Sequence, residues 1–158
     1  MLRYNTRFCS DKRYGGIRVL LKEGNIFSTP FCYEEVPLKH DIFDFAAFDR
    51  NPMEFYVVCT DIVTGEPVYH LCDDDDDWEM LEWFRASGSM PMVSRVVEIG
   101  GRKLLDGGIV CPVPYEFMES MGYDRNIIIL TQPEDFVKEK AKTLPLIRVA
   151  LHKYPAIV

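Results

Sequence analysis

An almost unbroken run of apolar residues at positions 54–60 is the clearest structural signal in the chain. It reads Glu-Phe-Tyr-Val-Val-Cys-Thr, and its β-branched and aromatic side chains predict a buried strand. The turn signal Thr64-Gly65-Glu66 follows, so residues 67–71 are expected to pair with this strand as a hairpin. Shorter apolar runs predict strands at residues 96–99 and 103–105, and a buried strand, parallel to its neighbours, at residues 126–130.

Helical periodicity separates these strands. It predicts a helix near residues 17–21 that stops at Gly24, a short one at 43–48 capped by Asp41 or Asp44, one at 78–86, one at 115–121 closed by Gly122, and a largely helical segment from Asp135 onward with a break at Pro145. Helices mixed with buried strands indicate an α/β layer architecture. The length of the chain favours a single domain over residues 1–158.

The charge and the cysteine pattern limit the classes of function. The chain has a formal net charge of -7 and no basic stripe, which argues against nucleic acid as a partner. Its five cysteines are scattered without C-x-x-C spacing, as in proteins of a reducing compartment. No apolar run reaches the roughly 18–20 residues that span a bilayer. We therefore expect a cytoplasmic protein whose contact with a membrane, if any, is peripheral.

The segment Leu105-Asp106-Gly107-Gly108 carries the most informative candidate chemistry. It places a carboxylate on a sharp turn at the end of a predicted strand. We expect Gly107 and Gly108 to supply backbone angles that other residues avoid and to leave the acid uncrowded. Asp106 is therefore a candidate general base, although Asp-Gly is also a common structural turn.

Other groups of reactive residues are less specific. The acidic run at residues 73–77 is either a divalent-cation site or a solvated loop that caps the next helix, and the loop is favoured because five consecutive side chains diverge. His40, His70 and His152 lack the spacing of a helical zinc site, so we expect no metal and no cofactor. A Cys–His or Ser–His pair that forms only in space stays open.

An ordered series of motifs resembles the patatin-like phospholipase family. The motifs are Thr60-Asp61-Ile62-Val63-Thr64-Gly65-Glu66, Arg85-Ala86-Ser87-Gly88-Ser89-Met90-Pro91-Met92-Val93-Ser94, Val97-Glu98-Ile99-Gly100-Gly101-Arg102, Leu105-Asp106-Gly107-Gly108 and Ile127-Ile128-Ile129-Leu130-Thr131-Gln132-Pro133. The series covers most of the chain and is closest to bacterial patatin-like proteins. It is more specific than a lone Asp-Gly-Gly.

The resemblance implies a lipid acyl hydrolase with a three-layer α/β/α sandwich and a Ser–Asp dyad. In that family the serine lies in G-x-S-x-G, on the elbow between a strand and a helix. A glycine-rich loop supplies the oxyanion hole, and the aspartate lies in D-G-G or D-G-A. Asp106 matches this aspartate, and the substrate would be a lipid or a small ester.

The serine elbow and the glycine-rich loop of the family have no counterpart in the sequence. We therefore interpret the chain as an internal fragment of a patatin-like protein, truncated at the N-terminus and also inside the C-terminal helical region. With the dyad aspartate only, it is expected to be inactive alone. The alternative is a non-catalytic interaction module of patatin-like fold.

Truncation would also leave the sheet incomplete. The strands around Val57 and Ile128 are then expected to keep an unpaired edge or an uncovered face. Such edges favour association, so we expect marginal stability or self-association through the exposed sheet edge.

Overall fold

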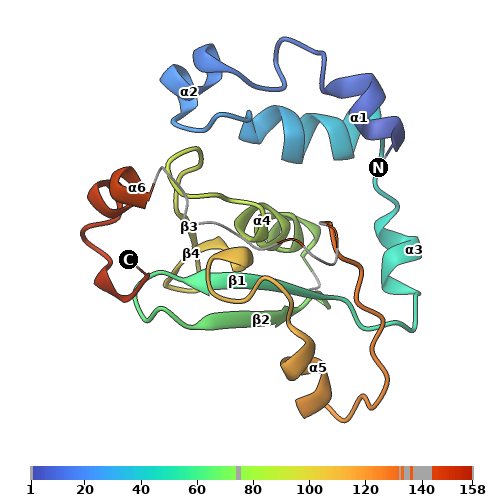
Figure 1. Ribbon diagram of the computed structural model, residues 1–158. Helices are drawn as coiled ribbons and strands as arrows, with labels where there is room; N and C mark the ends of the chain where they lie inside the picture. Colours follow the sequence, from blue (N-terminus) through green and yellow to red (C-terminus); the bar gives the residue numbers. More distant parts are fainter. Residues whose placement is uncertain (1, 74–75, 132, 134–135, 137–143, 158) are drawn as a thin grey trace.

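Four strands form one antiparallel sheet in the order β2-β1-β4-β3. The computed structural model in Figure 1 describes residues 2–73, 76–131, 133, 136 and 144–157. The strands are β1 (Tyr56–Asp61), β2 (Pro67–Leu71), β3 (Val97–Ile99) and β4 (Arg102–Asp106). All four predicted strands of this sheet are therefore confirmed, with small shifts of their ends.

Strand β1 lies inside the sheet. It pairs with β2 from Tyr56, opposite Leu71, to Thr60, opposite Pro67, which confirms the predicted hairpin. On its other side it pairs with β4, where Cys59 lies opposite Asp106. Strand β4 covers only the Cys59–Asp61 half of this edge, so the first half of β1, which includes Val57, pairs with β2 alone among the described residues. The expectation that the Val57 strand keeps an unpaired edge is therefore wrong only for the second half of the strand.

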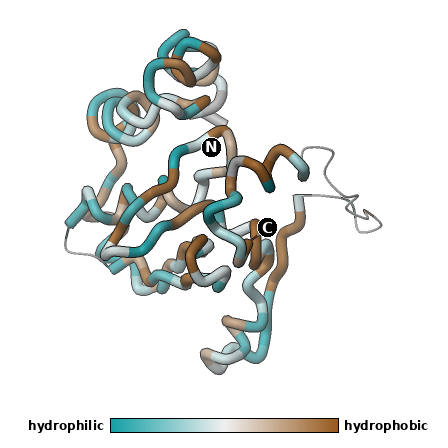
Figure 2. The backbone as a smooth tube through the Cα atoms, turned by 90° about the vertical axis from the view of Figure 1, so that its left-hand side faces the viewer, coloured by the Kyte–Doolittle hydropathy of each residue, from teal (hydrophilic) through white to brown (hydrophobic). Residues whose placement is uncertain are grey.

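The predicted strand at residues 126–130 is also wrong. The segment has an extended course but pairs with no strand among the residues that the structure describes, and each strand pairing that is seen is antiparallel. Ile127 is 95% exposed and Ile129 is 89% exposed. Figure 2 shows the segment as an apolar stretch at one side of the molecule. Its composition suits a buried strand, but a ladder also needs the edge of a neighbouring strand, and the segment is paired with none of the four described strands.

Side chains alternate along each strand, so apolar residues lie on both faces of the sheet. Helices cover both faces. On one face Val57, Cys59 and Leu104 pack against Met80 and Trp83 of α4 (Asp77–Ser87). The opposite face is covered near the C-terminus by α6 (Leu144–Ala150) and η3 (Pro155–Ile157), and elsewhere by α5 (Tyr115–Ser120). The α/β class with helical layers on either side is confirmed.

The neighbours Leu104 and Leu105 illustrate this alternation. Leu104 belongs to the cluster under α4, whereas Leu105 packs with Ile62 and Leu151 on the other face. The predicted break at Pro145 falls in the first turn of α6, where a missing N–H is tolerated. Residues 135 and 137–143 of the predicted helical segment lie outside the described residues.

Local capping signals fix an end of three of the described helices. Helix α2 (Ile17–Glu23) ends at Gly24, whose φ of 74° is left-handed. Helix α3 (Phe45–Asp49) is capped by Asp44, whose side chain accepts a hydrogen bond from Ala47 N at 2.9 Å. Asp76 caps α4 by accepting from Trp78 N at 2.9 Å, as the loop interpretation of the acidic run predicts. Asp74 and Asp75 of that run lie outside the described residues.

Two N-terminal helices were not defined by the sequence pattern. They are α1 (Leu2–Phe8) and η1 (Pro30–His40), an eleven-residue π-helix that contains Pro37. The helix continues past the proline with hydrogen bonds that span five residues instead of four, such as the bond from Asp41 N to Val36 O at 2.8 Å. Figure 1 shows these helices stacked together at one end of the molecule.

We expect Leu104→Ala to lower the free energy of unfolding by about 2–5 kcal/mol, because Leu104 is fully buried under α4 and the cavity would not collapse. Urea titration followed by circular dichroism measures the change. Leu146→Ala is the matched control, since Leu146 is 58% exposed on α6 and its change should stay within about 0.5 kcal/mol. Equal losses in the two variants would contradict this account of the core.

Candidate functional site

Asp106 lies at the last position of β4, and its main chain is held from two sides. Its N–H donates to the carbonyl oxygen of Ser89 at 2.8 Å, and its own carbonyl oxygen accepts from Thr60 Oγ1 at 2.8 Å. Thr60 and Ser89 are both buried. The base predicted from the sequence therefore starts from a fixed backbone, while its half-buried side chain reaches the surface.

One carboxylate oxygen of Asp106 holds the turn that follows β4. Its Oδ1 accepts from Gly108 N at 2.6 Å and caps η2 (Gly107–Ile109). No hydrogen bond to Oδ2 occurs among the residues that the structure describes. The two oxygens can therefore have different roles, with one fixing the carboxylate and the other able to accept a proton.

The two glycines after Asp106 supply space, not unusual backbone angles. Neither Gly107 nor Gly108 has a positive φ, so the expectation of special backbone angles is wrong. A Cβ on Gly107 would lie 2.4 Å from the carbonyl oxygen of Val58, and one on Gly108 would lie 2.9 Å from Asp106 Oδ1. The expectation that the glycines leave the acid uncrowded agrees with the geometry at Gly108 alone, because a Cβ on Gly107 would meet β1 and not the acid.

Asp106 borders a cleft of about 370 Å³ between β1 and the segment that leaves β4. The lining residues are 55–58, Ser87, 106–108, Cys111, Pro112 and Pro114. Ser87, at the end of α4, donates its hydroxyl to Val58 O at 2.9 Å. Its hydroxyl is therefore engaged with the main chain of β1 and does not form a dyad with the carboxylate.

Two cysteines lie near Asp106. Cys59 is fully buried, and burial first and the Asp106 charge second raise the pKa of its thiol to about 12. It stays protonated at neutral pH and is a poor nucleophile. Cys111 contacts the hydroxyl of Tyr69 at 3.4 Å, and this hydrogen bond, with burial, raises the pKa of Tyr69 to about 12.

The three histidines lie elsewhere in the fold. His40 is next to Glu35, His70 stacks on Trp83 at a centroid distance of 3.9 Å, and the ring of His152 contacts Val149 O at 2.8 Å. None of them lines the cleft of Asp106. The open alternative of a Cys–His or Ser–His pair therefore finds no support in the described part of this cleft.

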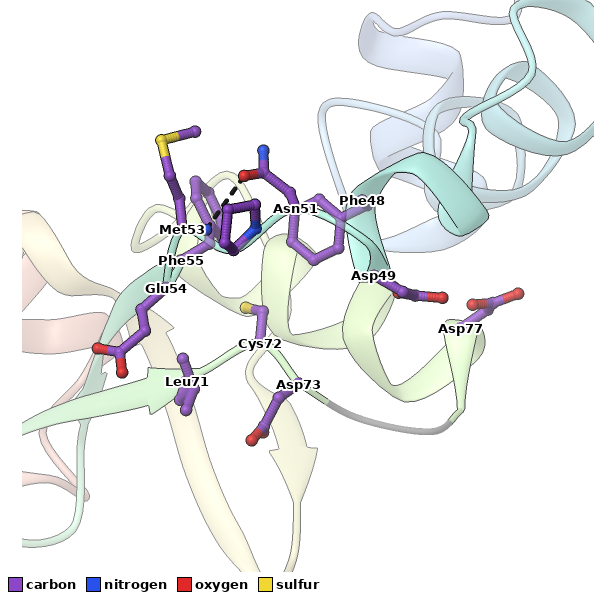
Figure 3. A pocket seen from close by; sticks show the side chains of 11 residues that line it. Phe48, Asp49, Asn51, Met53, Glu54, Phe55, Leu71, Cys72, Asp73 and Asp77 are labelled. Atoms are coloured by element: carbon purple, nitrogen blue, oxygen red, sulfur yellow. Dashed lines mark hydrogen bonds between the residues drawn. The ribbon is translucent and has the colours of Figure 1, made fainter.

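A second cavity, of about 460 Å³, adjoins the first and shares Phe55 with it. Figure 3 shows Phe48 and Phe55 in its wall and Asp49 and Asp77 close together on one side. The carboxylates disfavour an anionic ligand there. Within the described ranges, no group of three or more His, Cys, Asp or Glu side chains could hold a metal ion.

Comparison with known families identifies the chain. The model of the family described as patatin-like phospholipase matches residues 3–118, which is more than half of the chain. The chain belongs to the patatin-like phospholipase family. No curated protein matches it.

The family match covers all of the residues that build the site. Asp106 with its glycines, the Thr60 and Ser89 anchors and the cleft residues through Pro114 lie inside residues 3–118, whereas residues 126–130 and α6 lie outside. The sequence analysis quoted the motifs that contain Thr60, Ser87 and Ser89 but gave these residues no role. Their hydrogen bonds join positions up to 46 residues apart, which no local pattern reveals.

None of the helices in the described residues is both long enough and apolar enough to cross a membrane. This finding agrees with the absence of a long apolar run in the sequence.

We expect Gly107→Ala to destabilise the protein by about 1–3 kcal/mol, because its Cβ would collide with the main chain of β1. Gly108→Ala should cost less, since its Cβ would meet only the end of the Asp106 side chain and no main-chain atom, so that relief costs one hydrogen bond to Oδ1 and no movement of β1. Thermal unfolding of the two variants measures the difference. A larger loss for Gly108→Ala would contradict the close approach at Val58.

We expect the free energy of unfolding to fall as the pH rises above 9, because the buried Cys59 thiol resists losing its proton. The pKa of its thiol is raised from 9.0 to about 12 in the folded state, so the folded protein holds a proton that the unfolded chain releases above pH 9. The contribution is complete below pH 9 and is lost between pH 9 and 12. Urea titrations at pH 8 and pH 10.5 measure the free energy of unfolding, which should decrease less between these pH values in Cys59→Ala than in the parent. An equal decrease in both proteins would refute the contribution of the Cys59 thiol.

Proposed function

We propose that this chain is part of a serine acyl hydrolase that cleaves lipid esters, with Asp106 as the general base of a Ser–Asp dyad. The observation that carries the proposal is the placement of Asp106: a buried backbone anchor, a carboxylate fixed through Oδ1, and an open cleft beside it. Membership of the patatin-like phospholipase family supports a lipid as the substrate class.

In the proposed reaction Asp106 Oδ2 takes the proton of a serine hydroxyl while the serine oxygen attacks the ester carbonyl carbon. Backbone amides stabilise the tetrahedral oxyanion. The C–O bond to the alcohol then breaks, and the alcohol leaves with the proton that Asp106 holds. Water then attacks the acyl-serine while Asp106 takes a proton from it. The acyl–serine bond breaks, the carboxylic acid is released, and the serine oxygen regains the proton.

The nucleophile and the oxyanion hole of this reaction are not among the residues of the cleft. Ser87, the serine that borders it, is bonded to Val58 O. General base catalysis contributes about 10²–10⁴-fold but needs a hydroxyl to act on. We therefore propose that the 158-residue chain is inactive by itself and that Asp106, with Gly107 and Gly108 in support, works in a longer protein.

The proposed setting is a cytoplasmic protein that meets lipid at a membrane surface without spanning it. The acidic balance of the chain, with a net charge of -7, favours contact with zwitterionic over anionic lipid. We propose no metal, no cofactor and no nucleic-acid partner.

A second candidate function is that of a non-catalytic interaction module. The observation that favours it is the exposed apolar segment at residues 126–130, which offers a surface to another chain. A stable soluble product that binds a stoichiometric partner, together with an inactive upstream-extended form, would support it over the hydrolase.

The test compares this chain with a version extended upstream through the family's G-x-S-x-G. We expect hydrolysis of a p-nitrophenyl ester only in the extended version, where Asp106→Asn should lower kcat/KM by about 10²–10⁴-fold because the base is lost. Asp124→Asn, at an exposed position away from the cleft, is the matched control and should leave kcat/KM unchanged. Full activity of the extended Asp106→Asn variant would refute the role of Asp106, and fluorophosphonate labelling of the short chain would refute its inactivity.

A further inference from the structure

Helix α2 presents two apolar and two basic side chains to solvent on one face. Ile17 is 76% exposed and Leu21 is 84% exposed, and each is followed by an exposed cation, Arg18 and Lys22. These four positions span about 140° of the helix circumference, because each residue turns the helix by about 100°. Val19 points the other way and is buried. An apolar pair and a basic pair therefore run side by side along the outer face of α2.

The charge of the chain is divided unevenly, and α2 lies in the basic part. Residues 1–40 carry seven Lys and Arg against four Asp and Glu, a net charge of +3, whereas residues 41–158 carry 11 against 21, a net charge of -10. Figure 1 shows α2 with α1 and η1 at one end of the molecule, apart from the sheet. Charges are screened beyond about 8 Å at physiological ionic strength. The acidic balance of the whole chain therefore does not govern a contact that α2 makes.

The carboxylates beside α2 are engaged, and its two exposed cations are not. Glu23 accepts a hydrogen bond from Ser28 Oγ at 3.0 Å, and Glu35 accepts one from Arg13 Nη1 at 2.8 Å. The two cations form no hydrogen bond or ion pair with the residues that the structure describes. A hollow of about 280 Å³ between α2 and η1 opens beside them. An anionic group therefore has access to both cations.

We propose that α2 docks on an anionic phospholipid surface, with Ile17 and Leu21 in the apolar part of the interface and Arg18 and Lys22 at the headgroup phosphates. Amphipathic helices bind membranes through apolar burial together with electrostatic attraction to anionic lipid. Long basic side chains keep their charge in the polar layer while their stems lie along apolar groups. The docking rests on the membrane setting of the proposed function and gives it a definite surface, but it does not depend on the role of Asp106.

A protein occupant fits this face less well. A second copy related by a two-fold axis would bring the same cations together, which is unfavourable. A further segment of a longer chain would have to cover the apolar pair and also place carboxylates against two cations, since burying unpaired charges is costly. A lipid interface takes the apolar side chains and leaves the cations in its polar layer. Both protein occupants are outcomes that the experiment distinguishes.

The other exposed apolar segment, residues 126–130, fits a lipid interface less well than α2. It carries no charge, and none of its main-chain groups forms a hydrogen bond with the described residues. Such groups are costly in an apolar phase. In α2 the main chain is bonded internally, from Leu20 N to Gly16 O at 3.0 Å and from Gly24 N to Leu20 O at 2.9 Å. The helix can therefore enter an interface without leaving these groups unpaired.

The test is co-sedimentation of the 158-residue chain with vesicles of phosphatidylcholine that contain one third phosphatidylglycerol. We expect binding that weakens with added salt and that Arg18→Ala/Lys22→Ala lowers by about tenfold or more, because each cation near an anionic surface contributes about fivefold. Arg50→Ala/Arg125→Ala is the matched control, since both residues are exposed outside α2. It removes the same charge and should bind like the parent.

A second pair of variants tests the apolar contact. Leu21→Ser should lower vesicle binding by about tenfold, because a buried apolar side chain is lost. Leu130→Ser, at a position that is 57% exposed in the uncharged segment, should bind like the parent. Circular dichroism checks that all variants keep the parent fold. The hydrolysis assay of the extended version uses a dissolved ester and no vesicles, so the docking and the role of Asp106 can fail separately.

Several results would overturn the docking of α2 on lipid. They are the absence of vesicle binding, equally strong binding to pure phosphatidylcholine, equal losses in the α2 variants and their controls, and a concentration-dependent dimer that Leu21→Ser abolishes. Binding by the 158-residue chain that disappears in the upstream-extended version would show that the added segment covers α2, and would overturn it as well.

Discussion

The contact between Gly107 and the main chain of Val58 determines where the sheet ends and where Asp106 lies. Strand β4 pairs with β1 only as far as Cys59, after which the chain turns away. The turn passes so close to Val58 O that a Cβ at position 107 would lie 2.4 Å from it. A larger residue there would force β4 and β1 apart and move the carboxylate from the edge of its cleft.

The remaining features of the site follow from that close turn. The early end of β4 leaves the first half of β1 beside a cleft and not beside a strand. Ser87 supplies the hydrogen bond that Val58 O would otherwise receive from a continued ladder. Asp106 is fixed through its backbone by Thr60 and Ser89, so that the geometry of its carboxylate does not depend on a ligand.

Local signals in the sequence were sufficient for most of the fold. The β1–β2 hairpin, the Asp44 and Asp76 caps and the Gly24 stop depend on neighbours a few residues away, and each was predictable from them. The role of Gly107 was predictable only in part. Its sequence neighbours suggest unusual backbone angles, whereas the structure shows that the constraint is a chain segment about fifty residues earlier.

The segment at residues 126–130 shows why strand propensity alone does not place a strand. It is as apolar as β1, yet it stays exposed, because a strand gains its hydrogen bonds from an edge that some other segment must offer. Residues 126–130 border a cavity that shares Pro112 and Pro114 as wall residues with the Asp106 cleft. Proline has a fixed φ and few alternative positions. The segment that leaves β4 therefore forms a wall of both hollows, and the same two prolines bound the Asp106 cleft and the exposed residues 126–130.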